Sequence, residues 1–125
     1  MKTVLVIDDE AHILSLVRNC LEPHYRVLTA IDGEKGLEMA IQEKPDLVLC
    51  DILMPLMDGY EFAERMRFSA ELRSVPLVLL TAVSQTDSLL RAGEMGVTDY
   101  LIKPINVREL PGLVEDYIRT GPRPF

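Results

Sequence analysis

Four apolar segments of the sequence end at residues that could bind a cation or a phosphoryl group. Asp8 and Asp9 follow the first segment, Asp51 and Thr81 end the second and third, and Lys103 follows the fourth. In a parallel α/β sheet the ligand site lies outside the carboxyl ends of the strands, so these side chains should converge on one cleft. Three carboxylates, a hydroxyl and an ammonium group together indicate a divalent cation and phosphoryl chemistry.

The carboxylates favour a hard cation. Asp8 and Asp9 alone are equally consistent with the acidic start of a helix, which the helix dipole favours. Adding Asp51 at a neighbouring strand end brings together three carboxylates that repel one another, and Mg²⁺ relieves that repulsion because it prefers oxygen ligands. The two cysteines, Cys20 and Cys50, form no CxxC pair, so we expect free reduced thiols and no thiolate metal site.

The remaining residues suit phosphoryl transfer. Asp51 could be the nucleophile that forms an aspartyl-phosphate. The cation and Lys103 would neutralise charge on the phosphoryl oxygens, and Thr81 could donate a hydrogen bond to one of them. The simpler alternatives are a solvated loop aspartate at 51 and a surface lysine before Pro104, but they leave the grouping unexplained.

Hydrophobic periodicity predicts the elements that position these residues. Strands are predicted at 3–7, 26–30, 47–51, 77–81 and 99–103. Helices are predicted at about 11–21, after Asp32-Gly33, from Asp58-Gly59, at about 86–95 and from about 107. Strict alternation of strands and helices indicates an α/β fold with a parallel sheet and right-handed crossovers.

Two details of this assignment concern helices. Asn106 and Glu109 form a capping box for a last helix that begins near Val107, and Pro111-Gly112 should then bend or weaken that helix. In the second helix, we expect Leu37, Ala40 and Ile41 to form the buried face.

Composition bounds the possible functions. A chain of 125 residues is one domain, which we place at 1–120, with 121–125 as a linker-like or frayed tail. The net charge of −7 disfavours direct binding to nucleic acid. No apolar run is long enough to cross a membrane, and the first strand leaves no room for a signal peptide, so we expect a cytoplasmic protein.

Five motifs in order resemble the receiver domain of two-component response regulators, over about residues 2–120. They are Asp8-Asp9, Asp51 through Pro55 with Asp58-Gly59, Thr81-Ala82, Asp99-Tyr100-Leu101, and Lys103-Pro104. The resemblance implies a flavodoxin-like fold, with a five-stranded parallel sheet in the order 2-1-3-4-5 and five helices covering both faces.

The resemblance also implies roles for single residues. Asp51 matches the phosphoacceptor. Asp8, Asp9, Asp51 and the backbone carbonyl of Leu53 match the ligands of Mg²⁺. Thr81 and Lys103 match the residues that contact the phosphoryl group.

A switch and its partners are implied as well. Tyr100 matches the aromatic residue that turns inward when Thr81 moves toward the phosphate. The donor would be a histidine kinase or a phosphotransfer protein. The surface of the fourth helix, fifth strand and fifth helix would act on an output domain or downstream protein, with a homodimer as one possibility.

Three other functions compete with this signalling switch, which would not be an enzyme. A Mg²⁺-dependent phosphohydrolase of the haloacid-dehalogenase type needs an acid/base aspartate two residues after the nucleophile, where this chain has Leu53. A flavodoxin-like cofactor binder needs a first loop that cradles phosphate, and Asp8-Asp9-Glu10 would repel it. An unphosphorylated receiver-like scaffold is the third alternative, although such proteins commonly lose one of the five key residues.

Overall fold

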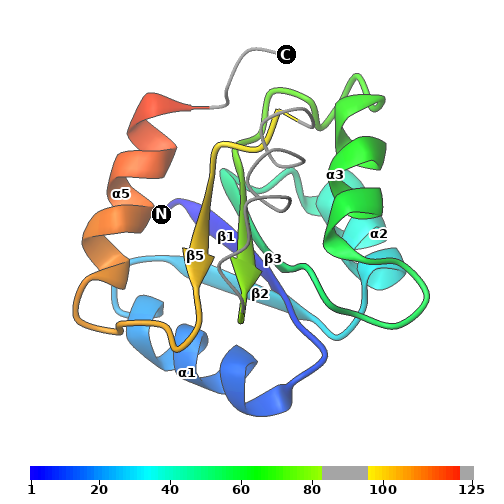
Figure 1. Ribbon diagram of the computed structural model, residues 1–125. Helices are drawn as coiled ribbons and strands as arrows, with labels where there is room; N and C mark the ends of the chain where they lie inside the picture. Colours follow the sequence, from blue (N-terminus) through cyan, green and yellow to red (C-terminus); the bar gives the residue numbers. More distant parts are fainter. Residues whose placement is uncertain (83–95, 122–125) are drawn as a thin grey trace.

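The computed structural model describes residues 1–82 and 96–121. A parallel five-stranded sheet in the order β2-β1-β3-β4-β5 forms its centre (Figure 1). The strands are β1 (Thr3–Ile7), β2 (Arg26–Ala30), β3 (Leu47–Asp51), β4 (Leu77–Thr81) and β5 (Asp99–Ile102). The helices are α1 (Ala11–Leu21), α2 (Gly33–Glu43), α3 (Gly59–Arg67) and α5 (Leu110–Thr120). The helix predicted at 86–95 lies outside the described residues.

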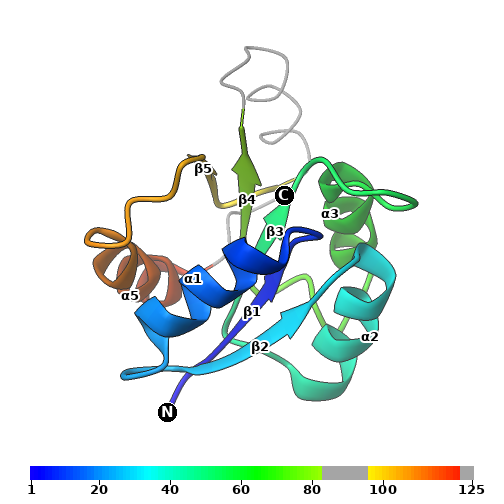
Figure 2. The ribbon, with the colours of Figure 1, turned by 90° about the horizontal axis from the view of Figure 1, so that it is seen from below.

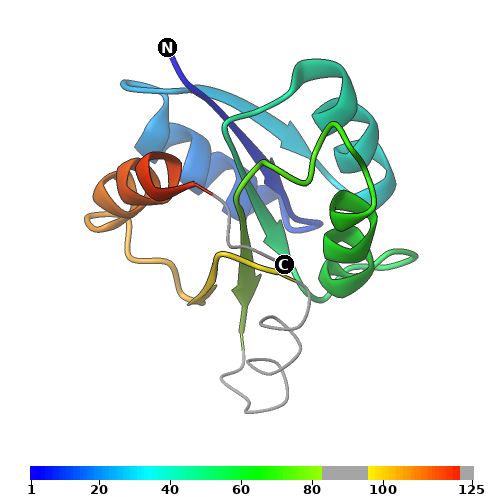
Figure 3. The ribbon, with the colours of Figure 1, turned by 90° about the horizontal axis from the view of Figure 1, so that it is seen from above.

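Helices cover both faces of the sheet. Figures 2 and 3 show α1 and α5 together on one face and α2 and α3 on the other. Side chains alternate along each strand, so the sheet supplies a separate apolar layer to each helix pair. Phe62 of α3 lies in one layer and Val17 of α1 in the other, both fully buried. Strands β1, β3 and β4 are buried at every residue, which explains why nearly all of their residues are apolar.

The sequence predicted most of this architecture correctly. The strand order and the bounds of four strands are confirmed, and α1 has the predicted range. The fifth strand ends at Ile102, one residue earlier than predicted. Ile41 is 42% exposed, so its assignment to the buried face of α2 is wrong. Cys20 and Cys50 are free thiols, as expected.

The last helix begins later than the capping box suggested. Residues 107–109 form a turn, in which the Asn106 side chain accepts a hydrogen bond from the Arg108 backbone N–H at 3.0 Å. Helix α5 starts at Leu110, which places Pro111 in its first turn. A proline is compatible with that position, since its missing N–H would have no helical partner there. The helix start predicted near Val107 is therefore wrong, and Pro111 does not follow a first helical turn as the prediction of a bend or weakening assumed.

Within the described ranges, no helix combines the length and apolar character needed to span a membrane.

Candidate functional site

The polar residues at the strand ends are held by backbone hydrogen bonds that extend the sheet. Asp8 donates its N–H to the Ala30 carbonyl at 3.1 Å, which continues the pairing of β1 with β2. Lys103 donates its N–H to the Thr81 carbonyl at 2.6 Å, which continues the pairing of β4 with β5. Asp51 lies opposite Leu80 of β4, so Thr81 is one residue beyond it on the adjacent strand.

Lys103 is the centre of an ion cluster. Its Nζ atom lies 2.8 Å from Oδ2 of Asp8, 3.4 Å from Oδ2 of Asp51 and 3.8 Å from Oε1 of Glu10. The Lys103 side chain is 12% exposed, so water screens these contacts weakly. The peptide bond to Pro104 is cis. The short distances and low exposure of Lys103 place its ammonium group inside the cleft, so it is not the surface lysine of the simpler alternative.

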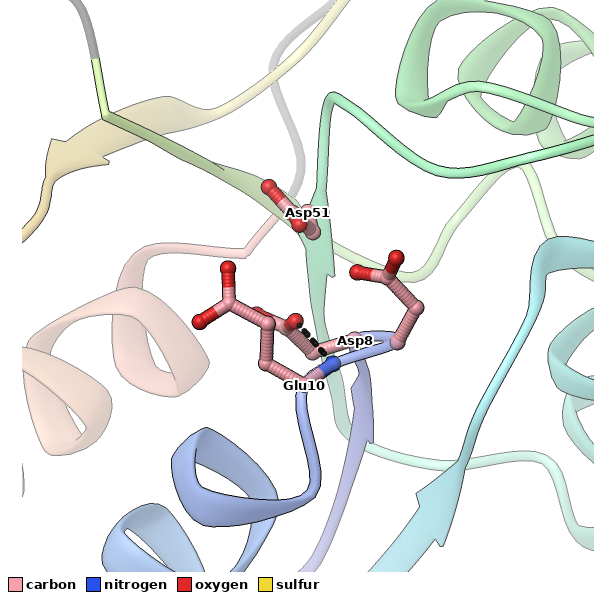
Figure 4. Close-up of side chains that lie close together, drawn as sticks. Asp8, Glu10 and Asp51 are labelled. Atoms are coloured by element: carbon pink, nitrogen blue, oxygen red, sulfur yellow. Dashed lines mark hydrogen bonds between the residues drawn. The ribbon is translucent and has the colours of Figure 1, made fainter.

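Four carboxylates lie close together in this cleft. Asp8, Asp9, Glu10 and Asp51 each offer an oxygen atom, and these oxygens all lie within 4.8 Å of one another. Figure 4 shows Asp8, Glu10 and Asp51 close together in the cleft, with the Glu10 N–H donating to Oδ1 of Asp8 at 2.9 Å. Asp8 is fully buried and Asp51 is 4% exposed.

Glu10 was absent from the predicted site. It is the third acidic residue of the run Asp8-Asp9-Glu10, and that run is the only signal in the sequence for its presence. Its Oε2 atom also lies 3.3 Å from Nε2 of His12, at the exposed edge of the cleft.

Burial and crowding of charge change the acidity of the cleft. Burial, followed by repulsion from Asp8, raises the pKa of Asp51 from 3.8 to about 6, although Lys103 opposes the change. Burial alone would lower the pKa of Lys103, but its hydrogen bond to Asp8 and the charges of Asp51, Asp8 and Glu10 raise that pKa above its ordinary value. In the absence of another cation, the lysine therefore remains charged and holds the carboxylates together.

The donor set fits a hard divalent cation. Among residues 1–82 and 96–121, every atom of this candidate ligand group is a carboxylate oxygen, the type that Mg²⁺ prefers, and no sulfur or imidazole joins it. Among the described residues, the Lys103 ammonium, 2.8 Å away, is the partner of the buried Oδ2 atom of Asp8. A cation would neutralise a group of carboxylates that one ammonium balances only in part.

The segment between β3 and α3 is anchored behind Asp51. The Gly59 N–H donates to the Ile52 carbonyl at 2.8 Å, and the Asp58 side chain caps α3 by accepting from the Glu61 N–H at 2.9 Å. A Cβ atom at Gly59 would lie 2.7 Å from the carbonyl oxygen of Asp51, so this close approach requires glycine. Leu53, on the same segment, is 69% exposed. A hydrogen bond from its backbone N–H opposes the rise in the pKa of Asp51.

The predicted switch residues lie on β4 and β5. Thr81 is 5% exposed, whereas Tyr100 is half-buried and packs against the α2–α3 core layer. On the residue before Tyr100, Oδ2 of Asp99 accepts a hydrogen bond from the Tyr117 hydroxyl of α5 at 2.8 Å. Burial and that bond raise the pKa of Tyr117 well above its usual range. Strand β5 and helix α5 are thus joined next to Tyr100.

A model of a known protein family matches most of the chain and is consistent with this arrangement of residues. The model of the response regulator receiver domain matches residues 4–115. The chain belongs to this family. The family consists of signalling domains of two-component systems, and the predicted resemblance is confirmed.

Relatives and solved structures support the assignment. The chain is 36% identical over 124 residues to RpaA of Synechocystis, a DNA-binding transcriptional regulator, and 37% identical over 119 residues to the Bacillus subtilis regulator PhoP. It covers 52% of RpaA and 49% of PhoP, so the chain spans about half the length of these relatives.

Two solved structures have the same fold. Vibrio cholerae CheY4, a chemotaxis protein, is similar with a TM-score of 0.88 and 30% identity, over 93% of this chain and 98% of that one. The receiver domain of the Pseudomonas aeruginosa histidine kinase PA1611 gives a TM-score of 0.86 and 27% identity, over 94% and 98%. That structure has a magnesium ion coordinated in its active-site cleft.

Proposed function

We propose that this receiver domain is a phosphorylation-controlled switch in which Asp51 accepts a phosphoryl group from a histidine kinase or phosphotransfer protein. The observation that carries the proposal is the position of the Lys103 ammonium, 3.4 Å from the Asp51 carboxylate inside a cleft of four carboxylates. A carboxylate nucleophile needs a cationic group at this distance, because charge on the transferring oxygens must be neutralised.

Mg²⁺ would be held by Asp8, Asp9, Asp51 and the backbone carbonyl of Leu53. When bound, the cation would neutralise part of the negative charge on the phosphoryl oxygens. The oxygen-only donor set supports this assignment, and so does the magnesium ion in the related PA1611 domain.

The residues of the chain perform the transfer itself. An ionised oxygen of Asp51 attacks phosphorus, the bond from phosphorus to the donor nitrogen breaks, and the donor keeps the bonding electrons. Lys103 then pairs with a phosphoryl oxygen in place of the Asp51 carboxylate. Thr81, on the adjacent strand, donates its hydroxyl hydrogen to another phosphoryl oxygen.

Phosphorylation would then change the surface near β5. Movement of Thr81 toward the phosphoryl group makes room for the half-buried Tyr100 ring to turn inward. The Tyr117–Asp99 hydrogen bond would transmit that change from β5 to α5. This surface would act on an output domain or downstream protein, or on a second copy of the chain. The domain would work in the cytoplasm without binding nucleic acid directly.

Two alternatives make different predictions. A phosphohydrolase would turn over substrate, but Leu53, two residues after Asp51, has no group that transfers a proton. An unphosphorylated scaffold would bind its partner without accepting a phosphoryl group. The burial of Asp51 beside the Lys103 ammonium favours the switch.

Intact-mass spectrometry tests the proposal. The protein is incubated with acetyl phosphate and Mg²⁺, beside samples with EDTA and the variant Asp51→Asn. We expect one phosphoryl adduct that requires both Mg²⁺ and Asp51. No adduct from acetyl phosphate or from a phosphorylated histidine phosphotransfer protein, with Mg²⁺ binding shown separately, would favour the scaffold.

A further inference from the structure

A groove of about 380 Å³ lies between α2, the segment joining β3 to α3, and α3 itself. Helices α2 and α3 lie on the side of the molecule away from α1 and α5 (Figure 1). Its lining shares no residue with the phosphorylation site described above. Apolar side chains of Leu37, Ile41, Leu56 and Met57 contribute to the lining.

Two of these apolar side chains are unusually exposed. Leu56 is 91% exposed and Ile41 is 42% exposed, so neither adds much to the core. Leu56 also has a φ of 70°, in the left-handed region, which is unfavourable for a residue with a Cβ atom. The chain thus presents a large aliphatic side chain to solvent at a conformational cost. An apolar group seated in the groove would remove both side chains from water.

The rim of the groove is acidic. Glu34 and Glu38 of α2 and Glu61 of α3 are exposed and line it together with Asp32, whereas Arg65 is the one cation in the lining. Within the described part of the chain, no ion pair engages the Glu34, Glu38 or Glu61 side chain. Four carboxylates against one guanidinium group repel anions such as phosphates and nucleic acids, and they attract a basic partner.

We infer that this groove binds a cationic amphipathic segment of a partner protein. One aliphatic side chain of the segment lies between Leu56 and Ile41, and its lysine or arginine side chains pair with Glu34, Glu38 and Glu61. Apolar contact supplies affinity, and the acidic rim selects basic partners and speeds their association. The inference does not depend on phosphorylation of Asp51.

A fluorescent peptide with leucine and lysine at helical spacing tests the inference. It is titrated into the Mg²⁺-saturated protein, so that the cation blocks the acidic cleft, and amide chemical shifts locate the contact. We expect saturable binding, with shifts confined to α2, residues 52–58 and α3. A peptide with glutamate in place of lysine should not bind. Absence of binding, or shifts elsewhere on this acidic chain, would overturn the inference.

Matched variants distinguish binding in the groove from general electrostatic attraction between the basic peptide and this acidic chain. Leu56→Asn keeps a residue that tolerates the left-handed conformation, and Phe68→Asn removes an exposed side chain outside the groove. Glu61→Gln removes an exposed charge of α3 inside the groove, and Glu64→Gln removes an exposed charge of the same helix outside it. We expect Leu56→Asn to weaken binding roughly tenfold and Glu61→Gln several-fold. If Phe68→Asn and Glu64→Gln lost as much affinity for the peptide as their partners in the groove, and amide spectra showed that all variants were folded, the inference would be contradicted.

Discussion

At Asp51, function and folding make opposite demands on one carboxylate. The side chain must be ionised to attack phosphorus, yet burial and the nearby Asp8 raise its pKa to about 6. Lys103 limits the cost by pairing with both residues. The cleft without its cation is therefore a charged site that reduces the stability of the fold.

Replacement of this charge should stabilise the cation-free domain. The native pKa of Asp51, about 6, exceeds the ordinary value of 3.8, so the native chain binds more protons between these pH values. The free energy of unfolding should therefore fall as pH rises from about 4 to about 6, by roughly 2–3 kcal/mol at 1.4 kcal/mol per pKa unit. In EDTA at pH 7, Asp51→Asn should recover roughly 1–3 kcal/mol in urea denaturation.

The control for that experiment is Glu64→Gln, which removes one exposed carboxylate from α3. Its free energy of unfolding should follow the wild-type pH profile. If the free energy of unfolding of Asp51→Asn fell between pH 4 and 6 as steeply as that of the wild type, the raised pKa of Asp51 would not explain the pH dependence.

Loss of the ammonium group should have the opposite effect. Lys103→Met leaves Asp8 fully buried without its cation, and removal of one partner from a buried ion pair costs about 3–5 kcal/mol. We expect a loss of stability near the lower end of that range, because the cleft is partly open to water. The loss should be larger at pH 7.5 than at pH 5, where Asp51 binds a proton.

Urea denaturation at both pH values measures this difference, with the exposed Lys35→Met as control. An equal loss at the two pH values would instead indicate lost packing of the lysine stem. The variant should also form no phosphoryl adduct, even when Mg²⁺ restores part of its stability.

Among the elements, the segment from Asp51 to Gly59 is constrained by close contacts between backbone atoms. Its backbone turns back against the end of β3, so a Cβ atom at Gly59 would lie 2.8 Å from the Ile52 Cα atom and 2.7 Å from the Asp51 carbonyl oxygen. Both neighbours are backbone atoms, which cannot rotate away. A side chain at 59 would therefore displace the residue that carries the phosphoacceptor carboxylate.

Gly59→Ala should consequently reduce both stability and phosphorylation. Overpacking of this kind costs about 1–3 kcal/mol, and a shifted Asp51 should accept phosphate more slowly from acetyl phosphate. Gly112→Ala in α5 is the matched control, since its Cβ atom would meet nothing within 4 Å. That change should stabilise the domain slightly through helix propensity. Thermal unfolding and formation of the phosphoryl adduct are measured on both variants. Equal changes in Gly59→Ala and Gly112→Ala would show that the close backbone contacts of Gly59 do not position Asp51.

The helices show where sequence patterns succeed and fail. Apolar spacing located α1 correctly because its buried positions, Ile13, Leu14, Val17 and Leu21, repeat at the helical period. The start of α5 was misplaced because Asn106 and Glu109 resemble a capping box, whereas Asn106 caps only a turn. The conformational restriction of Pro111 decides the helix start, and this outweighs the local capping signal.

On the scale of the whole molecule, the site could be predicted because parallel strands end at one edge of the sheet. Alternation of strands and helices predicted this convergence, but the strand order came only from the resemblance to receiver domains. The distance from Lys103 to each carboxylate depends on tertiary packing, so the sequence could not give it. The same is true of Glu10, whose side chain turns toward the cleft from the start of α1.

Cation binding should stabilise the whole domain. A ligand that binds only the native state raises stability with its concentration, by about 2.7 kcal/mol at 100 times its Kd. Mg²⁺ should therefore raise Tm in a saturable manner in thermal scans at pH 7.5. Asp9→Asn should shift that response to higher Mg²⁺ concentration, whereas Glu38→Gln should not. An unchanged response in Asp9→Asn would remove Asp9 from the proposed ligand set.

Chemical trapping can show whether Asp51 carries the phosphoryl group. After incubation with acetyl phosphate and Mg²⁺, borohydride reduces an aspartyl-phosphate to homoserine, which tandem mass spectrometry locates in the digested chain. We expect homoserine at position 51 alone, and none in a sample treated with EDTA. Homoserine at position 8 or 9, or reduced glutamate at position 10, with Asp51 intact, would contradict this expectation.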